Sequence, residues 1–174
     1  MSSTATHLLL TTNPGLESIV ADEFRQRCAD TELPAPQVEL RPFGLDGHVI
    51  VHTTDGGAET ALQLRSIHHV LRLLYRFDLT DESTAIEAFA DSIGDTGNHG
   101  EDPPPAPCPE IARIYRVLRQ RGVPELDAAT TFRVTAKRSG THSFTSMDVQ
   151  RFAGGALLAR HGCAVDLENY EVDV

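Results

Sequence analysis

The sequence predicts an α+β protein built from two small domains, and three observations carry this prediction. Residues 1–79 alternate between strand-like and helix-like apolar patterns in the order βαββαβ. Residues 131–167 show a second strand, helix and strand pattern. Between them, residues 94–109 are rich in Gly, Pro and Asp and offer little to bury in a core. We therefore expect one domain at residues 1–79 and another at residues 80–174, with a mobile insertion at residues 94–109.

The first domain begins with an apolar run, residues 8–10, that predicts a short buried strand. Asn13 and Pro14 then offer an N-cap and a first helical position. The helix that they start is expected to bury the face formed by Leu16, Ile19, Val20 and Phe24.

The rest of this domain continues the same alternation. Residues 38–40 and 49–51 flank a glycine-containing turn and predict a hairpin. Residues 58–65 predict a second helix and residues 69–77 a last strand. The resulting order, βαββαβ, is that of a ferredoxin-like domain. Residues 82–93 carry apolar side chains at helical spacing and predict a helix that bridges the two domains.

The second domain contains a helix and then a strand with one cationic face. Ile111, Ile114, Tyr115 and Leu118 fall on one helical face, which predicts that Arg113 and Arg116 face solvent. In residues 131–138, apolar residues alternate with polar ones, as in a half-buried strand. The cationic face of this strand is expected to present Arg133 and Lys137, with Arg138 leading into the next turn.

A capped helix follows this strand. Thr145 and Asp148 have the spacing of a capping box, and Phe144 is placed to pack against Val149 as a hydrophobic staple. Gly162 predicts the helix end, and alternation in residues 163–167 predicts a final strand.

Charge is distributed unevenly along the chain. The net charge of −10 argues against a nucleic-acid partner for the chain as a whole. Residues 109–161, however, hold nine basic and four acidic side chains, a balance of +5. Because salt screens charges over about 8–10 Å, this local excess is more informative than the total. The alternative is a solvated charged surface without a ligand.

Several classes of protein lack support in this sequence. No apolar run approaches the roughly 18 residues that span a bilayer, so we expect no membrane insertion. Three distant cysteines suggest neither a disulfide framework nor a zinc site and favour a reducing, cytoplasmic setting. We find no nucleophile with a nearby base, no glycine-rich cofactor loop, and no aromatic residue after Asp102-Pro103-Pro104 that could stack on a target base. The chain is therefore expected to be non-catalytic, with no cofactor of its own.

The second domain closely resembles the THUMP domain, an RNA-binding module of tRNA-modifying enzymes. The matching residues are TFRVTAKRSGTHSFTSMDVQR and GCAVDLENYEVDV. TTNPGLESIVADEF and LRSIHHVLRLLYRF resemble the ferredoxin-like domain that precedes THUMP in tRNA guanine-N2 methyltransferases, which are related to ribosomal RNA methyltransferases. This resemblance implies binding to the acceptor end of tRNA, with rRNA as a second candidate. It also implies a Rossmann-like domain outside this chain that binds S-adenosylmethionine and transfers the methyl group.

Basic side chains of the second domain are the candidate RNA contacts, because phosphate contacts supply much of the affinity for RNA. His142, in the turn after the cationic strand, could contact a nucleotide or help to cap the helix. The candidates are Arg113, Arg116, Arg133, Lys137, Arg138, His142 and Arg151. The alternatives are a free-standing adaptor that binds RNA or a protein without catalysis, and part of a tRNA sulfur-transfer enzyme. The last residues still alternate like a strand, so we expect the chain to be part of a longer protein.

Overall fold

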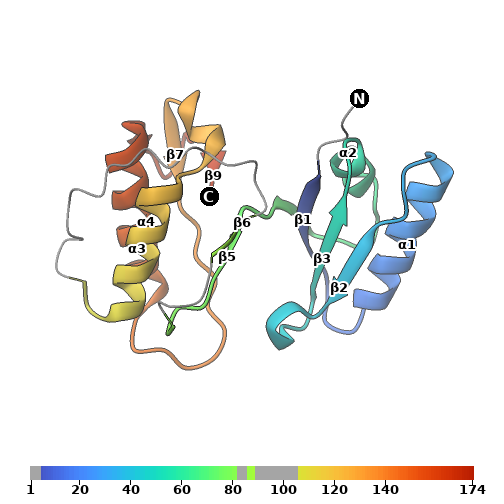
Figure 1. The fold of residues 1–174 in the computed structure, drawn as a ribbon, viewed down its shortest axis with the longest axis horizontal. Helices are drawn as coiled ribbons and strands as arrows, with labels where there is room; N and C mark the ends of the chain where they lie inside the picture. Colours follow the sequence, from blue (N-terminus) through green and yellow to red (C-terminus); the bar gives the residue numbers. More distant parts are fainter. Residues whose placement is uncertain (1–4, 82–85, 89–105) are drawn as a thin grey trace. The chain divides into compact units, whose positions relative to one another are not determined.

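The structure is a computed structural model that describes residues 5–81, 86–88 and 106–174. The chain divides into two compact units: unit 1 comprises Met1–Arg76 and Glu87–Ala90, and unit 2 comprises Phe77–Ile86 and Asp91–Val174. Both units combine helices and strands, so the α+β class is confirmed (Figure 1). Most of the predicted insertion, including the motif at residues 102–104, lies outside the described residues.

Unit 1 contains a four-stranded antiparallel sheet in the order β2-β3-β1-β4. Its strands are β1 (Thr6–Thr11), β2 (Gln37–Leu40), β3 (His48–Thr53) and β4 (His69–Arg72). The helices α1 (Glu17–Asp30) and α2 (Gly57–Ala61) give the βαββαβ order predicted from the sequence. Two further strands, β5 (Tyr75–Arg76) and β6 (Glu87–Ala88), pair separately as an antiparallel ladder.

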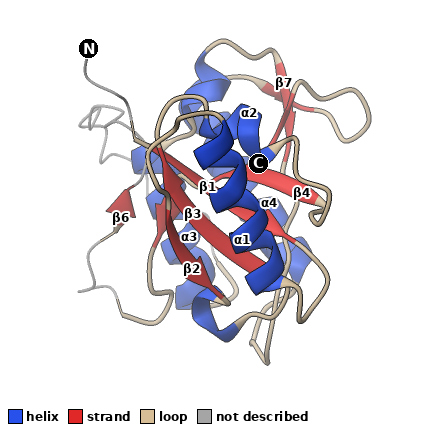
Figure 2. Cartoon of the chain, turned by 90° about the vertical axis from the view of Figure 1, so that its right-hand side faces the viewer, coloured by secondary structure: helices blue, strands red, loops and turns tan. Residues whose placement is uncertain are grey.

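The core of unit 1 lies between this sheet and α1, which crosses one face of the sheet (Figure 2). Leu8 and Leu10 of β1 and Val51 of β3 point into the core because alternate residues of a strand share a face. Val20 and Phe24 of α1 pack against them and are fully buried. The predicted hairpin is confirmed, since β2 pairs with β3 across the turn formed by residues 42–47.

The start of α1 differs from the prediction. The helix begins at Glu17, with Leu16 as N-cap, and not at Pro14. Gly15 has φ +92°, a left-handed conformation that cannot continue a right-handed helix. The buried stripe of α1 includes Val20, Ala21, Phe24 and Cys28, which pack toward the sheet, while Ile19 lies one residue off this stripe and is 54% exposed.

Three other predicted elements are shorter or different. α2 ends at Ala61, which leaves Leu62 exposed. The strand predicted at residues 69–77 is interrupted: its ladder with β1 reaches only Arg72, and residues 75–76 join β6 instead. The bridging helix predicted at residues 82–93 is wrong in its described part, because residues 87–88 form a strand with β5 as partner.

Glu17 anchors the turn of the hairpin to the start of α1. Its buried carboxylate accepts hydrogen bonds from the backbone N–H of Gly47 at 2.6 Å and of Gly15 at 3.1 Å. Arg41 lies 3.7 Å away and adds a favourable charge. The N–H of Gly47, that of Glu17 itself and that of Gly15 lower the pKa of Glu17 to about 2. Glu17, the acidic residue of the TTNPGLE motif, therefore has a structural role: it links the hairpin turn to the start of α1.

Unit 2 packs two helices against a small parallel sheet. α3 (Pro109–Arg121) and α4 (Ser146–His161) lie side by side (Figure 1). The strands β7 (Thr131–Arg133), β8 (Ala164–Val165) and β9 (Val172–Asp173) form a sheet in the order β8-β7-β9, with β7 parallel to both neighbours. The apolar cluster between the helices contains Ile111, Ile114, Tyr115, Phe144, Phe152, Ala153 and Ala156.

The start of α4 confirms the predicted capping box. The Thr145 side chain accepts the backbone N–H of Asp148, and the Asp148 carboxylate accepts the backbone N–H of Thr145. Phe144 is buried and Val149 packs against the same cluster, as expected for the staple. Gly162 ends the helix with φ +75°. The local sequence around α4 thus fixes both of its ends.

The two helices run in the same direction. At their C-terminal ends, Nη1 of Arg160 donates to the carbonyl of Arg119 at 3.1 Å, and Nε2 of His161 accepts the N–H of Val123 at 3.0 Å. At the other end, the His142 ring lies 5.0 Å from the ring of Phe144, which shares the apolar cluster with Ile111 in the first turn of α3. The N-terminal ends of both helices therefore lie on the same side of unit 2, beside the loop that precedes α4.

Candidate nucleic-acid interface

The cationic strand predicted at residues 131–138 is present only in its first half. β7 ends at Arg133, and its last ladder bond runs from the N–H of Thr135 to the carbonyl of Val174. The predicted strand face shared by Arg133 and Lys137 is therefore wrong, because Lys137 lies in the following loop. The final strand predicted at residues 163–167 is likewise reduced to residues 164–165.

Arg133 is held by two residues near the end of the chain. Its Nη2 lies 2.6 Å from Oδ2 of Asp173, and its guanidinium lies 3.9 Å from the centre of the Tyr170 ring. Thr135 donates to the other carboxylate oxygen of Asp173 at 2.8 Å. The hydrogen bond from Arg133 is the main cause that lowers the pKa of Asp173. Arg133 thus has an internal anion as its partner.

Lys137, Arg138 and His142 are exposed in the loop that leads to α4. Nε2 of His142 donates to the carbonyl of Ser139 at 2.7 Å, and its ring lies 5.0 Å from the ring of Phe144. The guanidinium of Arg138 also lies over Phe144, at 6.0 Å. Because Phe144 is buried in the helix cluster, it ties this loop to the core.

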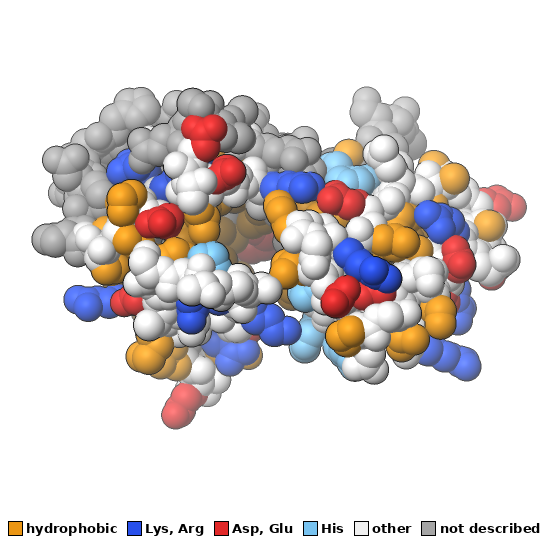
Figure 3. Space-filling view, turned by 90° about the horizontal axis from the view of Figure 1, so that it is seen from below, with side chains coloured by type: hydrophobic (Ala, Val, Ile, Leu, Met, Phe, Trp, Pro, Cys, Tyr) orange, Lys and Arg blue, Asp and Glu red, His pale blue; other side chains and the backbone are white. Residues whose placement is uncertain are grey.

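Arg151, exposed on the second turn of α4, adds a fourth basic group. The N–H and hydroxyl of Thr145 are the main causes of the low pKa of Asp148, and the charges of Arg151 and Arg138 lower it further. Arg138 and Arg151 therefore both lie near the start of α4. We use the name cationic rim for Lys137, Arg138, His142 and Arg151. Figure 3 shows Lys and Arg side chains close together at the lower left, on unit 2.

Arg113 and Arg116, the two candidate arginines on α3, differ in how far they are exposed. Arg113 was expected at the surface but is only 6% exposed, with its guanidinium 5.8 Å from the centre of the Phe77 ring. The apolar face of α3 is wider than predicted, because Val117 is buried as well. Arg116 is half-buried. Arg113 is therefore a core side chain, and the prediction that it faces solvent is wrong.

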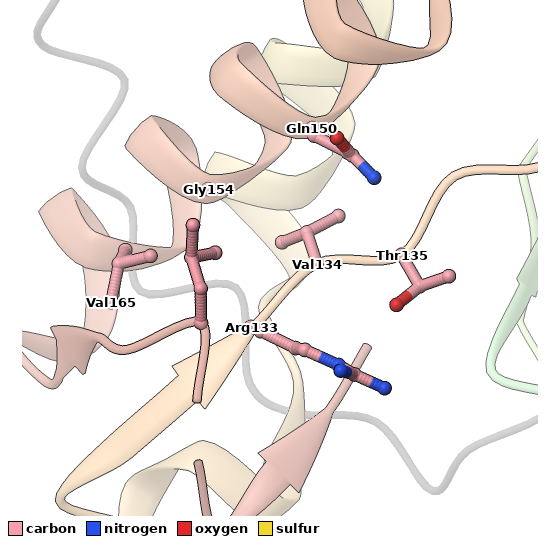
Figure 4. A pocket seen from close by; sticks show the side chains of 7 residues that line it. Arg133, Val134, Thr135, Gln150, Gly154 and Val165 are labelled. Carbon is pink, nitrogen blue, oxygen red and sulfur yellow. The ribbon is translucent and has the colours of Figure 1, made fainter. Parts of the chain in front are cut away.

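A pocket of about 300 Å³ lies between α4 and the ends of β7 and β8. Gln150 and Gly154 line it from the helix, and the side chains of Val134 and Val165 lie opposite (Figure 4). Its other walls are Arg133, Thr135 and Leu167. Because β7 and β8 are parallel, this pocket lies just outside the carboxyl ends of neighbouring strands, where ligands bind in open α/β sheets.

Sequence reasoning missed the residues that complete this region. Tyr170 and Asp173 stand out in the sequence only as part of an alternating C-terminal pattern, although four acidic residues in the last thirteen could have suggested a partner for the basic segment. Gln150 and Gly154 carry no sequence signal of their own, because their role depends on which helix face meets the sheet.

The described part of the chain offers neither a metal centre nor a membrane span. No three His, Cys, Asp or Glu side chains in it are placed to hold a metal ion together. None of its helices is long and apolar enough to cross a membrane.

Comparison with known proteins shows what this chain is similar to. Residues 110–174 match the family model of the THUMP domain. The tRNA (guanine(6)-N2)-methyltransferase of Thermus thermophilus is 30% identical over 164 residues, which cover 94% of this chain and 39% of that protein. A probable tRNA sulfurtransferase of Aeropyrum pernix is 32% identical over 145 residues, 83% of this chain and 30% of that protein.

A solved structure is similar across both units. The crystal structure of TrmN from Thermus thermophilus aligns with a TM-score of 0.57 and 28% identity, covering 97% of this chain and 41% of that one. The chain thus covers 41% of the chain in that crystal structure, 39% of the curated methyltransferase and 30% of the curated sulfurtransferase.

Proposed function

Because this chain carries a THUMP domain at residues 110–174, we propose that it is the RNA-binding portion of a tRNA-modifying enzyme and that the cationic rim contacts tRNA. Both curated relatives are named for modification of tRNA, one by methyl transfer and one by sulfur transfer. The methyltransferase is matched over the larger share of this chain, which favours a guanine-N2 methyltransferase as the parent protein.

The observation that carries this proposal is the position of the rim. Its exposed basic side chains lie in the loop before α4 and in the second turn of that helix, where the backbone dipole also favours anions. An RNA backbone presents a row of phosphates, so several modest contacts can act together. Arg133 at the edge of this surface is neutralised by Asp173 and contributes less than its charge suggests.

The finer parts of the proposal rest on the family resemblance of the sequence motifs. Unit 1, as a ferredoxin-like domain, and the THUMP domain would together bind the acceptor end of tRNA, with rRNA as the alternative target. Methyl transfer would belong to a Rossmann-like domain that binds S-adenosylmethionine, and this chain by itself would transfer no methyl group. We propose a cytoplasmic location, as for other RNA-modifying machinery.

A second candidate is an adaptor that binds a protein partner. The net charge of −10 favours it, since an acidic protein repels RNA except where basic groups cluster. The two candidates differ in how binding responds to salt and to removal of rim charges.

The test compares two double variants that each remove two positive charges. Lys137→Ala with Arg138→Ala removes two rim charges, whereas Arg119→Ala with Arg121→Ala removes two from the opposite end of α3. Binding of a tRNA transcript is measured by fluorescence anisotropy at several salt concentrations. The rim variant should bind more weakly, and the slope of log K against log salt should shrink by roughly 0.7 to 0.9 for each phosphate that the variant no longer neutralises.

The outcomes separate the candidates. If the rim double variant binds tRNA more weakly than the α3 double variant does, RNA binding at the rim is supported. Equal affinities of the two variants would show that only net charge matters. If the wild-type chain binds no tRNA even at low salt, RNA binding by this chain is wrong and the adaptor is favoured.

A further inference from the structure

Two histidines face each other on the sheet of unit 1. His7 of β1 lies directly opposite His52 of β3, the neighbouring strand (Figure 2). Leu8 and Val51, the adjacent residues, point into the core, so alternation places both imidazoles on the other face of the sheet. Their Nδ1 atoms lie 2.6 Å apart, and their ring planes make an angle of 72°. The two half-buried rings thus turn the same nitrogen toward each other.

A contact between two imidazole nitrogens requires one proton between them. A neutral imidazole has one nitrogen that donates and one that accepts, so one of the two rings carries its proton on Nδ1 and donates it to the other. If that proton moves to Nε2 of its own ring, both rings stay neutral and two nitrogen lone pairs converge on one point. Converging neutral imidazoles are ligands that zinc, nickel and copper ions prefer.

The distance between the two nitrogens is close to the spacing that a shared metal ion imposes. Metal–nitrogen bonds of about 2.0 to 2.1 Å at angles of roughly 90° to 110° place two ligand nitrogens roughly 2.9 to 3.4 Å apart. The observed 2.6 Å must therefore open by roughly 0.3 to 0.8 Å. Small rotations of the two side chains can supply this opening, because the rings already point at each other across the ladder.

The neighbours of the pair suit a small metal site. Gln37 of β2 lies opposite His52 on its other side, so these two residues and His7 form one row across three strands. Leu9 and Ile50 are the next pair on the same face, and Ile50 is only 1% exposed. Apolar neighbours limit solvent access to a metal. The described residues place no third His, Cys, Asp or Glu with the pair, so water must complete the coordination.

We propose that His7 and His52 form a two-histidine site for a divalent transition-metal ion of the zinc and nickel class. On binding, each Nδ1 gives its lone pair to the ion, and the proton of the donating ring passes through water to Nε2 of that ring. The bound ion would join β1 to β3 at the start of the described chain. This site goes beyond the proposed function and does not depend on RNA binding.

His48 provides a matched control. It lies on the same strand and the same face as His52, but the residue opposite it on β1 is Thr11. Its Nδ1 lies 2.8 Å from the carbonyl oxygen of Asp46. His48→Gln therefore removes one imidazole from this face and leaves the pair intact. His7→Gln and His52→Gln each remove one ligand, and having two such variants keeps the test valid if one of them does not fold.

The experiment uses the chain without a histidine tag. Its melting temperature is measured with NiCl₂, ZnCl₂ or MgCl₂, and its affinity for Ni²⁺ is measured by titration calorimetry. Ni²⁺ and Zn²⁺ should raise the melting temperature, because an ion that binds only the folded state stabilises it. Mg²⁺ should not, since it prefers oxygen ligands. His7→Gln and His52→Gln should bind Ni²⁺ at least about tenfold more weakly, because loss of even a supporting group costs roughly 10- to 100-fold in metal affinity.

The pair is supported if His48→Gln keeps the wild-type affinity for Ni²⁺ while the folded pair variants lose it. Three results would overturn the proposal. The wild type could show no response to Ni²⁺ or Zn²⁺, or a folded pair variant could keep the full affinity. Alternatively, His48→Gln could lose as much affinity as His52→Gln, which would mean that the histidines of this face bind metal without a defined site.

Discussion

Arg133 and Asp173 lie opposite each other on the parallel strands β7 and β9 and form an ion pair of 2.6 Å. The guanidinium also packs on Tyr170, so this arginine of the predicted cationic strand face is held by its own chain. An arginine with an internal carboxylate partner is a poorer ligand for phosphate, because the carboxylate must first be displaced.

Asp173→Asn should therefore release Arg133 for RNA. We expect tighter tRNA binding at low salt and a slope of log K against log salt that is steeper by roughly 0.7 to 0.9, as for one additional neutralised phosphate. The melting temperature should fall, since the ion pair and its link to Thr135 are weakened. Glu168→Gln, which removes an exposed charge from the same segment, is the control for net charge. Identical salt slopes in the two variants would contradict the expectation that Asp173→Asn releases Arg133 for RNA.

Glu17 should make the free energy of unfolding depend on pH between about 2 and 4.5. Its pKa is about 2 in the folded protein and near 4.5 when unfolded, so the unfolded state binds more protons between these values. The stabilisation is complete above about pH 4.5 and is lost as the pH falls toward 2. Glu17→Gln should lower the melting temperature at neutral pH, and its difference from the wild type should shrink below pH 4.5. Glu59→Gln, exposed on α2, should show no such trend.

Arg113 should matter for folding and not directly for RNA. Arg113→Ala empties a buried position of α3 beside Phe77, and we expect a loss on the order of 2 kcal/mol in the free energy of unfolding. Arg116→Ala, one turn on and only half-buried, should cost less. Denaturant unfolding of both variants measures the difference in their free energies of unfolding. Equal costs would mean that the burial of Arg113 adds no stability beyond that of Arg116.

The capping box of α4 should contribute measurable stability. Thr145→Ala removes the acceptor for the N–H of Asp148 and should cost about 1 kcal/mol. Thr141→Ala, exposed in the same loop, should be near neutral. Denaturant titration compares them, and a cost for Thr141→Ala as large as that for Thr145→Ala would show that the loop and not the cap is responsible.

What could be predicted from the sequence alone was what local chemistry determines. The capping box at Thr145 and the end of α4 at Gly162 depend on residues within one turn of each other, so their spacing was sufficient. The βαββαβ order of unit 1 followed from alternation, because a strand with one buried face must alternate whatever its partner.

Only the tertiary structure decided the length of β7, the burial of Arg113, and the partners of Arg133 and Glu17. Each depends on groups far away in the chain: Asp173 is forty residues from Arg133, and Gly47 is thirty from Glu17. A strand lasts only as long as its neighbours offer ladder bonds, and a helix face is buried only as widely as the next element covers it. The pocket likewise exists because β7, β8 and α4 meet around a glycine, and no single segment of the sequence contains that information.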